Sequence, residues 1–237
     1  MRVRSVTGAA DRPRDMRPGL ITFDAYAALC DYKSSLLPAV EVIPGLDTAR
    51  ATDFLELWRA RQLGIAALSN ALERGRITFR ECTALALDYG LKRYGLEVHA
   101  GLSDELVHAW YPLTPWPETN AVLAALKSRG FALAILSNGD TDMLEALAAG
   151  IDTPFDHIFS SEQCGMYKPH PSIYGIPARL VGVDDYLHVA GSANDVVGAS
   201  AAGVRCYWSN RNADFVALPA YAPHHQGPDL SGILDVL

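Results

Sequence analysis

The spacing of hydrophobic residues changes about halfway along this chain. In the first half, apolar side chains such as Phe54, Leu57, Leu63 and Leu68 recur at three- and four-residue steps, which is typical of amphipathic helices. An S/T-x-x-E signature at Thr78 also marks a helix start. The pattern predicts helices over Thr48–Arg74, Thr78–Tyr94 and Ser103–Trp110.

After the proline-rich stretch YPLTPWPET, short apolar runs alternate with helix-like segments. Together with the first apolar run of the chain, these runs predict strands at Leu20–Phe23, Ala132–Leu136, His157–Ser160, Tyr186–Ala190 and Arg205–Trp208. Helices are predicted at Glu118–Arg129, Thr141–Ala149, Pro171–Leu180 and Asp195–Ala202. Such alternation is typical of a parallel sheet with crossover helices, so we expect an α/β fold with a Rossmann-like core.

The pattern also predicts how the chain is divided. Residues 19–33 and 113–237 are expected to form the α/β core, and the helical block of residues 34–112 to be inserted over the edge where the strands end. Residues 1–18 have no apolar run of the kind found in a secretory signal. They are expected to be a flexible N-terminal tail.

Composition and charge narrow the partners. The chain has 237 residues, of which 49% are hydrophobic, so it can bury a large core. Its net charge of −7 offers no basic stripe for a nucleic-acid backbone. No run approaches the roughly 18 apolar residues of a membrane helix, and the four cysteines show no CxxC spacing for zinc. We therefore expect a cytoplasmic protein with no metal site and with neither nucleic acid nor membrane as partner.

Four polar segments are predicted to meet at one edge of the sheet. Ligands of open parallel sheets bind beyond the carboxyl ends of the strands, so these segments would face one crevice. They are ITFDAYAAL with Asp24, LSNG with Ser137 and Asn138, KPHPSIY with Lys168, and HVAGSANDVVGA with Asp195. Asp24 would act as a nucleophile there, with Lys168 neutralising its charge and Asp195 holding the lysine. Ser137 and Asn138 would hydrogen-bond an anion.

Each of these residues also has a simpler interpretation. An aspartate at a strand end is more often a turn or helix cap, which applies to Asp24. Asp195 is about as well explained as the N-cap of the helix that it is expected to start. Ser137 and Asn138 alone would be turn formers, and Lys168 before a proline would be a solvated charge. Only the order of the segments favours a site.

That order resembles the haloacid dehalogenase superfamily, and within it the L-2-haloacid dehalogenases, from about residue 19 to the end. The phosphatases of this superfamily carry an aspartate two residues after the nucleophile, where this chain has Tyr26, the D-x-Y form seen in dehalogenases. They also carry an acidic residue at the position of Gly191, which helps to bind magnesium. The resemblance therefore favours a dehalogenase over a metal-assisted phosphatase.

The inserted helical block, the cap in this family, carries a further match. The segment LWRARQL resembles the dehalogenase cap sequence whose arginine reaches the active site, and Arg59 holds that position. Without the resemblance, Arg59 would instead be expected to pair with Glu56 or Asp53 on the surface. Tyr174 lies six residues after Lys168, as in the dehalogenases. An equally common role for residues such as Tyr26 and Tyr174 is packing in the core, with a local hydrogen-bond partner for the hydroxyl.

The resemblance implies a two-step displacement without a cofactor. Asp24 would attack the carbon that bears the halogen with inversion, and water placed by Asp195 and Lys168 would then hydrolyse the aspartyl ester. Short L-2-haloacids are the implied substrates, 2-hydroxy acids the products, and a homodimer the implied assembly. Tyr26, Arg59, Ser137, Asn138, Tyr174, Ser192 and Asn194 are the expected substrate-binding residues.

Several positions depart from the family pattern. Ala27 and Ala28 replace a glycine and a threonine, while Ala190 and Ser192 replace a serine and an asparagine that help to place the hydrolytic water. Asn194 replaces an aromatic residue. Three alternatives follow: a related hydrolase that opens a strained 2-carboxylated ring, a magnesium-dependent phosphatase, and a catalytically degraded member that binds a small carboxylate or a protein partner.

Overall fold

A computed structural model of the chain describes residues 19–237, so the predicted tail over residues 1–18 lies outside the described part. Its strands are β1 (Leu20–Phe23), β2 (Ala132–Ser137), β3 (His157–Ser160), β4 (Leu187–Ala190), β5 (Arg205–Ser209) and β6 (His225–Gly227). The α-helices are α1 (Tyr32–Glu41), α2 (Thr48–Leu72), α3 (Phe79–Tyr94), α4 (Ala100–His108), α5 (Thr119–Ser128), α6 (Thr141–Ala149), α7 (Pro171–Tyr174), α8 (Ile176–Val181) and α9 (Ala193–Ala201). Short helical turns are η1 (Ala25–Leu29), η2 (Ser161–Gln163), η3 (Pro219–Tyr221) and η4 (Ser231–Asp235).

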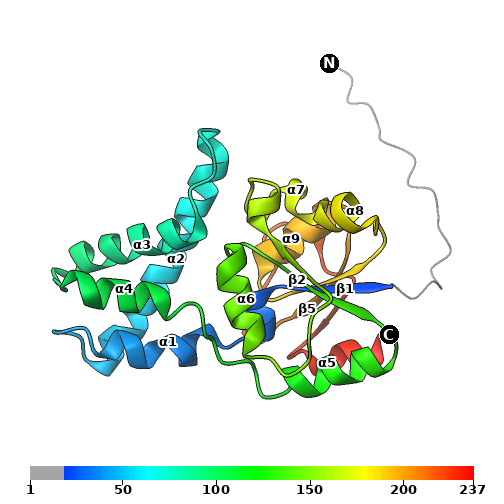
Figure 1. Cartoon of the computed structure of the whole chain (residues 1–237), viewed down its shortest axis with the longest axis horizontal. Helices are drawn as coiled ribbons and strands as arrows, with labels where there is room; N and C mark the ends of the chain where they lie inside the picture. Colours follow the sequence, from blue (N-terminus) through cyan, green and yellow to red (C-terminus); the bar gives the residue numbers. More distant parts are fainter. Residues whose placement is uncertain (1–18) are drawn as a thin grey trace.

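The six strands form one parallel sheet in the order β3-β2-β1-β4-β5-β6. One face packs on α5 and α6 through residues such as Ile21 and Ile135, and the other packs on α7, α8 and α9 through residues such as Leu136 and Ala190. Both faces are therefore covered by helices, as expected for a parallel sheet (Figure 1). This arrangement confirms the predicted α/β fold with a Rossmann-like core.

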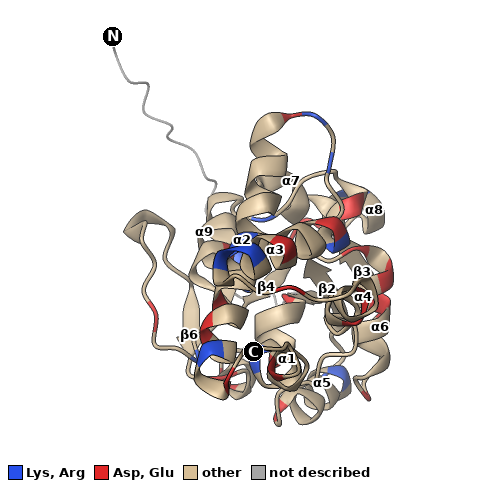
Figure 2. Cartoon of the chain, turned by 90° about the vertical axis from the view of Figure 1, so that its left-hand side faces the viewer, with Lys and Arg blue, Asp and Glu red and all other residues tan. Residues whose placement is uncertain are grey.

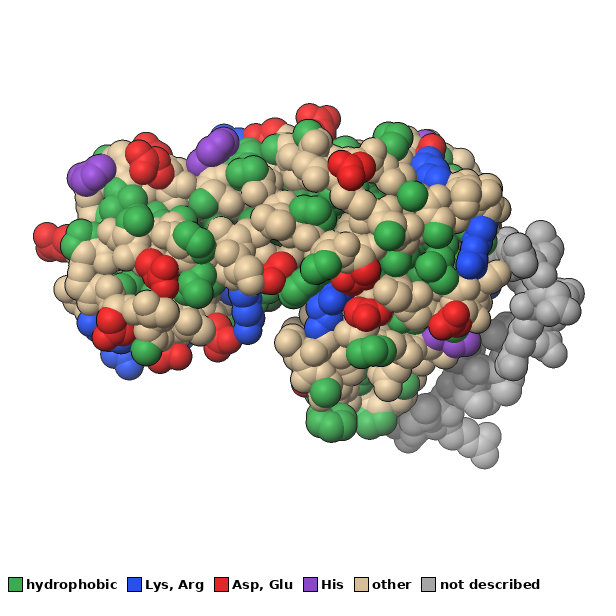
Figure 3. Space-filling view, turned by 90° about the horizontal axis from the view of Figure 1, so that it is seen from below, with side chains coloured by type: hydrophobic (Ala, Val, Ile, Leu, Met, Phe, Trp, Pro, Cys, Tyr) green, Lys and Arg blue, Asp and Glu red, His purple; other side chains and the backbone are tan. Residues whose placement is uncertain are grey.

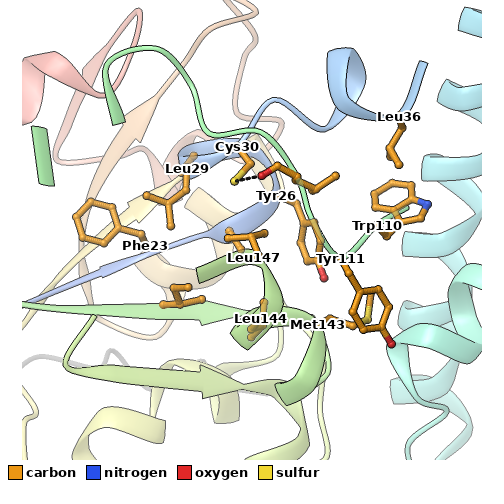
Figure 4. Close-up of a cluster of buried hydrophobic side chains, with 14 of the residues drawn as sticks. Phe23, Tyr26, Leu29, Cys30, Leu36, Trp110, Tyr111, Met143, Leu144 and Leu147 are labelled. Carbon is orange, nitrogen blue, oxygen red and sulfur yellow. Dashed lines mark hydrogen bonds between the residues drawn. The ribbon is translucent and has the colours of Figure 1, made fainter. Parts of the chain in front are cut away.

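The four helices α1 to α4 form a separate lobe beside the carboxyl ends of the strands (Figure 1). Aromatic side chains fill its centre, where Trp58 is fully buried. Tyr26 extends from the sheet side toward Trp110 of the helical lobe, so one hydrophobic cluster runs through both lobes (Figure 4). The rings of Tyr26 and Trp110 meet edge to face with centroids 6.1 Å apart.

The predicted strands are confirmed within one residue, but three helical features differ. The helix expected over Pro171–Leu180 is divided at Gly175, because Pro177 lacks an N–H and clashes with the preceding turn. Helix α1 was not predicted, since Pro38 within it obscures the helical pattern. The last helix begins at Ala193 with Ser192 as its N-cap, so the prediction that Asp195 caps it is wrong.

Polar contacts near Asp140 join the two lobes. The Asp140 carboxylate forms a buried ion pair with Arg76 and accepts hydrogen bonds from the backbone N–H groups of Phe79 and Arg80, each at 2.9 Å. These N–H groups belong to the first turn of α3, where a carboxylate is favoured. The start of α3 is therefore fixed on the loop that follows β2.

A second contact joins α2 to the loop before α7. The Asn70 side chain donates to the carbonyl of Tyr167 and accepts from its N–H, both at 2.9 Å. Because Tyr167 immediately precedes Lys168, this contact fixes the backbone beside a predicted site residue.

The surface is mixed in character. Lys and Arg positions are scattered along the ribbon in Figure 2, and a hollow separates the two lobes in the view of Figure 3. Within the described residues, no helix is long and apolar enough to cross a membrane.

The Asp140 contact yields a stability prediction. We expect Asp140→Ala to lower the free energy of unfolding by about 3–5 kcal/mol, because the buried Arg76 then keeps only the more distant Glu162, at 3.9 Å, and two N–H groups of α3 lose their acceptor. Asp142→Ala is the matched control, since Asp142 pairs with Arg80 from the same helix start while both side chains are about half exposed. Asp142→Ala should lower the free energy of unfolding by at most about 1 kcal/mol. Urea unfolding of both variants measures the difference, and equal losses would contradict it.

Candidate active site

Asp24 directly follows the carboxyl end of β1, a strand inside the sheet, and the helical lobe lies beyond that end of the sheet (Figure 1). Its Oδ2 accepts a hydrogen bond from the N–H of Ala27 at 3.1 Å, so it caps the turn η1. The turn-cap interpretation is thus confirmed. Its Oδ1 faces the Ser137 hydroxyl at 3.4 Å and the Lys168 ammonium at 3.3 Å. The side chain is 14% exposed, which leaves the carboxylate reachable by a small ligand.

The Lys168 ammonium lies between two carboxylates. Its Nζ is 2.8 Å from Asp195 Oδ2 and 3.3 Å from Asp24 Oδ1, and the side chain is only 7% exposed. Burial lowers the pKa of Lys168, but the charges of Asp195 and Asp24 raise it more, so the pKa lies above its ordinary value. The interpretation of Lys168 as a solvated charge is wrong.

Asp195 is held by several donors. The Tyr174 hydroxyl donates to its Oδ1 at 2.7 Å, and His188 Nε2 lies 3.0 Å from its Oδ2. Burial alone would raise the pKa of Asp195, but Lys168 and His188 lower it well below its usual range. Tyr174 therefore lies behind Asp195, where its hydroxyl has a local partner.

Ser137 and Asn138 end β2 beside this cluster and are both buried. The Ser137 hydroxyl is directed at Asp24, and Asn138 Oδ1 accepts the N–H of Lys168 at 2.7 Å. Asn138 thus fixes the lysine backbone. Among the described residues its Nδ2 has no acceptor, so an N–H donor is left for an anion.

Arg59 reaches the junction of the lobes from α2. Its guanidinium lies 5.1–5.3 Å from the ring centroids of Tyr26, Tyr32 and Trp110, and it donates to Gln62 at 2.5 Å. No carboxylate within residues 19–237 forms an ion pair with it. Burial lowers the pKa of Arg59, which nearby Tyr32 and Asp24 raise in part. A buried guanidinium without a carboxylate partner is suited to an anion.

Glu56, one of the two carboxylates that were predicted to pair with Arg59 on the surface, binds a different cation. Glu56 pairs with Lys33 at 2.7 Å, so the interpretation of Arg59 as one half of a surface pair is wrong for Glu56. Tyr26 is 1% exposed, and its hydroxyl has no hydrogen-bond partner among the described residues.

Two predicted substrate-binding residues lie farther from the cluster. Ser192 and Asn194 are exposed, and the Ser192 hydroxyl accepts the N–H of Asp195 at 3.4 Å as the cap of α9. Ala190, which precedes them, is fully buried. Within residues 19–237, neither the Ser192 nor the Asn194 side chain hydrogen-bonds to Asp24 or Lys168.

Sequence reasoning missed three neighbours of the site. His188 was assigned only to a strand, and Tyr32 and Trp110 were not considered as neighbours of Arg59. A histidine seven residues before Asp195 within a buried strand was the available signal for the first. No signal was available for the two rings, because their contacts depend on how the lobes dock.

A known protein family matches most of this chain. The model of the haloacid dehalogenase-like hydrolases matches residues 20–203. The chain belongs to this family. The predicted superfamily membership is therefore confirmed.

Within this family, the chain is similar to named dehalogenases. A haloacetate dehalogenase H-2 of Moraxella sp. strain B is 35% identical over 195 residues, which cover 81% of this chain and 85% of the relative. An (S)-2-haloacid dehalogenase of Pseudomonas sp. strain YL is 30% identical and covers 91% and 93%. Both are bacterial enzymes whose names refer to dehalogenation of small acids.

Solved structures of L-2-haloacid dehalogenases are similar to the fold of this chain. The L-2-haloacid dehalogenase of Xanthobacter autotrophicus with chloropropionic acid covalently bound has a TM-score of 0.79 and 27% identity, covering 93% of this chain and 98% of that one. Another L-2-haloacid dehalogenase has a TM-score of 0.86 and 28% identity, covering 93% and 99%. The resemblance to the L-2-haloacid dehalogenases thus extends to the whole described fold.

The lowered pKa of Asp195 predicts acid sensitivity. A carboxylate whose pKa falls on folding stabilises the protein above its unfolded pKa of about 3.9, and that contribution is lost as the pH falls further. The free energy of unfolding should therefore fall by up to about 1.4 kcal/mol per pH unit from this group. Asp195→Asn should flatten the slope of the free energy of unfolding against pH between about pH 4 and 2.5. Urea unfolding over that range measures it, and equal slopes in wild type and Asp195→Asn would refute the assignment.

Proposed function

We propose that this hydrolase removes the halogen from short L-2-haloacids and releases the 2-hydroxy acid by way of an ester on Asp24. The observation that carries the proposal is the buried Asp24–Lys168–Asp195 cluster at the mouth of the sheet. Membership in the dehalogenase family and the covalent chloropropionic acid complex of a relative support it.

In the first step, Asp24 attacks the carbon that bears the halogen. The Lys168 ammonium lies 3.3 Å from the Asp24 carboxylate, and the Ala27 N–H and Ser137 hydroxyl limit the rotation of that carboxylate. A carbon–oxygen bond forms on the face opposite the carbon–halogen bond, which breaks with its electron pair on the halide. The configuration at C2 therefore inverts.

Arg59 and Asn138 are proposed to hold the substrate. The guanidinium of Arg59 has no carboxylate partner among the described residues, and it lies over the Tyr26 ring just beyond Asp24. Both the substrate carboxylate and the departing halide are anions that it can stabilise. Asn138 Nδ2 supplies a second N–H donor. Tyr26, Tyr174, Ser192 and Asn194 remain proposed contacts, of which Tyr174 acts through Asp195.

In the second step, water attacks the carbonyl carbon of the ester. The bond from that carbon to the substrate oxygen breaks, the 2-hydroxy acid leaves with one proton, and a second proton is released as Asp24 becomes a carboxylate again. Asp195 and Lys168 lie where they can place this water and stabilise the oxyanion.

The phosphatase alternative is poorly supported by the local geometry. A Cβ at position 191 would lie 2.6 Å from the carbonyl carbon and the Cβ of Ala27. The acidic residue that phosphatases carry there therefore has no room in this backbone. Tyr26 also occupies the position of the phosphatase acid. The chemistry proposed here uses no cofactor, and magnesium would enter only with the phosphatase alternative.

Finer expectations belong to the same proposal. We propose that residues 34–112 act as a cap over the core of residues 19–33 and 113–237, with Arg59 as the cap's contribution to the site. A cytoplasmic location, a homodimer, and partners limited to a small carboxylate substrate, with no nucleic acid or membrane, also remain predictions.

Replacing the nucleophile tests the proposal. Asp24→Asn should abolish chloride release from L-2-chloropropionate, because a neutral amide is a far weaker nucleophile than a carboxylate. A single turnover of the wild type in heavy-oxygen water should place the label on the Asp24 peptide, since water attacks the aspartyl carbonyl. Chloride measurement and peptide mass spectrometry are the readouts.

The same experiment separates the alternatives. Chloride release that persists in Asp24→Asn would overturn the proposal. Label on Asp24 with a strained 2-carboxylated ring but not with the haloacid would favour the ring-opening hydrolase. Magnesium-dependent hydrolysis of a phosphate ester would favour the phosphatase, and absence of any turnover would favour the binding role suggested by Ala190 and Ser192.

The role of Arg59 is tested by a change that keeps the charge. Arg59→Lys should raise KM for L-2-chloropropionate by about 10- to 100-fold, because an ammonium cannot reproduce the planar guanidinium between aromatic rings. Arg61→Lys, on the same helix over Tyr89, is the matched control and should leave KM unchanged. Steady-state chloride release measures both, and unchanged kinetics in Arg59→Lys would remove Arg59 from the site.

A further inference from the structure

A histidine that the proposed mechanism does not use lies against its charged cluster. His188 is in the middle of β4 and has no solvent exposure. Its Nε2 is 3.0 Å from Asp195 Oδ2 and 3.3 Å from Lys168 Nζ, and its Nδ1 is 2.8 Å from the Thr22 hydroxyl. Thr22 is the residue paired with His188 across β1 and β4.

These contacts determine which ring nitrogen carries the proton. A carboxylate oxygen at 3.0 Å needs a donor, so Nε2 is protonated and donates to Asp195. Nδ1 then has a free electron pair, which accepts the Thr22 O–H. The opposite tautomer would place the Nε2 electron pair against a carboxylate. The Thr22 hydroxyl can donate as well as accept, so it accommodates the tautomer that the Asp195 contact requires.

We infer that His188 is a positioning residue of the hydrolase: its Nε2–H holds Asp195 in place, so that Lys168 remains shared between Asp195 and the nucleophile Asp24. The inference rests on the proposed function and extends it to a residue outside the substrate pocket. Tyr174 holds Oδ1 of the same carboxylate, and His188 holds Oδ2 together with the lysine. Without the histidine, Oδ2 has Lys168 as its one side-chain donor within the described residues, and the ammonium shifts away from Asp24.

The charge of His188 matters to the same arrangement. The ionisable groups that face its ring from neighbouring elements are Asp24, Lys168, Tyr174, Asp195 and Cys206. Burial raises the pKa of the Tyr174 and Cys206 side chains, so both stay neutral. A protonated ring would bring a second cation 3.3 Å from the lysine and compete with it for Asp195.

Two substitutions separate the hydrogen bond from the volume of the ring. His188→Gln keeps an N–H donor that can reach Asp195, while His188→Phe keeps an aromatic ring without a donor. We expect His188→Phe to lower kcat for L-2-chloropropionate by about 10- to 100-fold with KM changed less than about twofold, the range of one hydrogen bond to a charged group. His188→Gln should recover most of kcat. Equal losses in both variants would overturn the inference, because packing alone would then explain the effect.

The pH profile gives a second readout that packing would not move. Burial lowers the pKa of His188 below its ordinary value of about 6.5. The ring therefore stays neutral at that pH and gains a proton only at a more acidic pH. Wild-type kcat should therefore fall as the ring gains its proton below that value, and His188→Gln should keep its kcat to a lower pH. An identical acid limb in wild type and His188→Gln would contradict the role of the charge.

A measurement without substrate distinguishes failure of this inference from failure of the proposed function. Nitrogen-15 NMR of imidazole-labelled protein should show one histidine, absent in His188→Gln, with Nε2 protonated and Nδ1 accepting at neutral pH. The opposite tautomer would overturn the inference whatever the substrate is. The expected tautomer without any chloride release by the wild type would leave the arrangement intact and refute the dehalogenase activity instead.

Discussion

The site depends on one buried ammonium group held between two carboxylates. Lys168 is surrounded by protein, and a lone charge there would be strongly unfavourable. Asp195 and Asp24 remove that cost, yet together they carry one more negative charge than the lysine neutralises. Asp195 can remain ionised because Tyr174 and His188 also bind it. Three donors reach each carboxylate, but those to Asp24 lie at 3.1–3.4 Å and those to Asp195 at 2.7–3.0 Å, so Asp24, the proposed nucleophile, is the more loosely held of the two.

Docking of the helical lobe places the second cation of the site. Arg59 lies on α2 over the Tyr26 ring, and the lobe that carries it is held to the sheet by the shared hydrophobic cluster, by the contact of α3 with Asp140 and by that of α2 with the backbone of Tyr167. Both anchors adjoin site residues in the chain: Asp140 follows the LSNG turn, and Tyr167 precedes Lys168. A displacement of the lobe would therefore alter both cations of the site.

The sequence predicts which residues meet when their positions follow from the order of the strands. It does not predict contacts that form only when strands pair or when the two lobes pack together. Asp24, Lys168 and Asp195 could be placed together because strand ends in a parallel sheet share one edge. The partnership of His188 with Thr22 depends on strand register between residues 166 positions apart, which no local pattern reveals. The aromatic surroundings of Arg59 likewise arise only when two lobes meet. Helix α1 was hidden by a proline, a local signal that tertiary packing overrides.

The departures from the dehalogenase pattern leave the charged cluster unchanged. Ala27 still supplies a backbone N–H to Asp24, and Ser192 and Asn194 are exposed. The charges also suit both steps of an ester mechanism. In the proposed mechanism, esterification removes the negative charge of Asp24, so Lys168 can turn toward the ester carbonyl, where an oxyanion forms as water attacks. Arg59 remains for the anion that leaves. The departures therefore spare the charged groups on which the proposed reaction depends, so any effect on turnover would have to come from the residues around those groups.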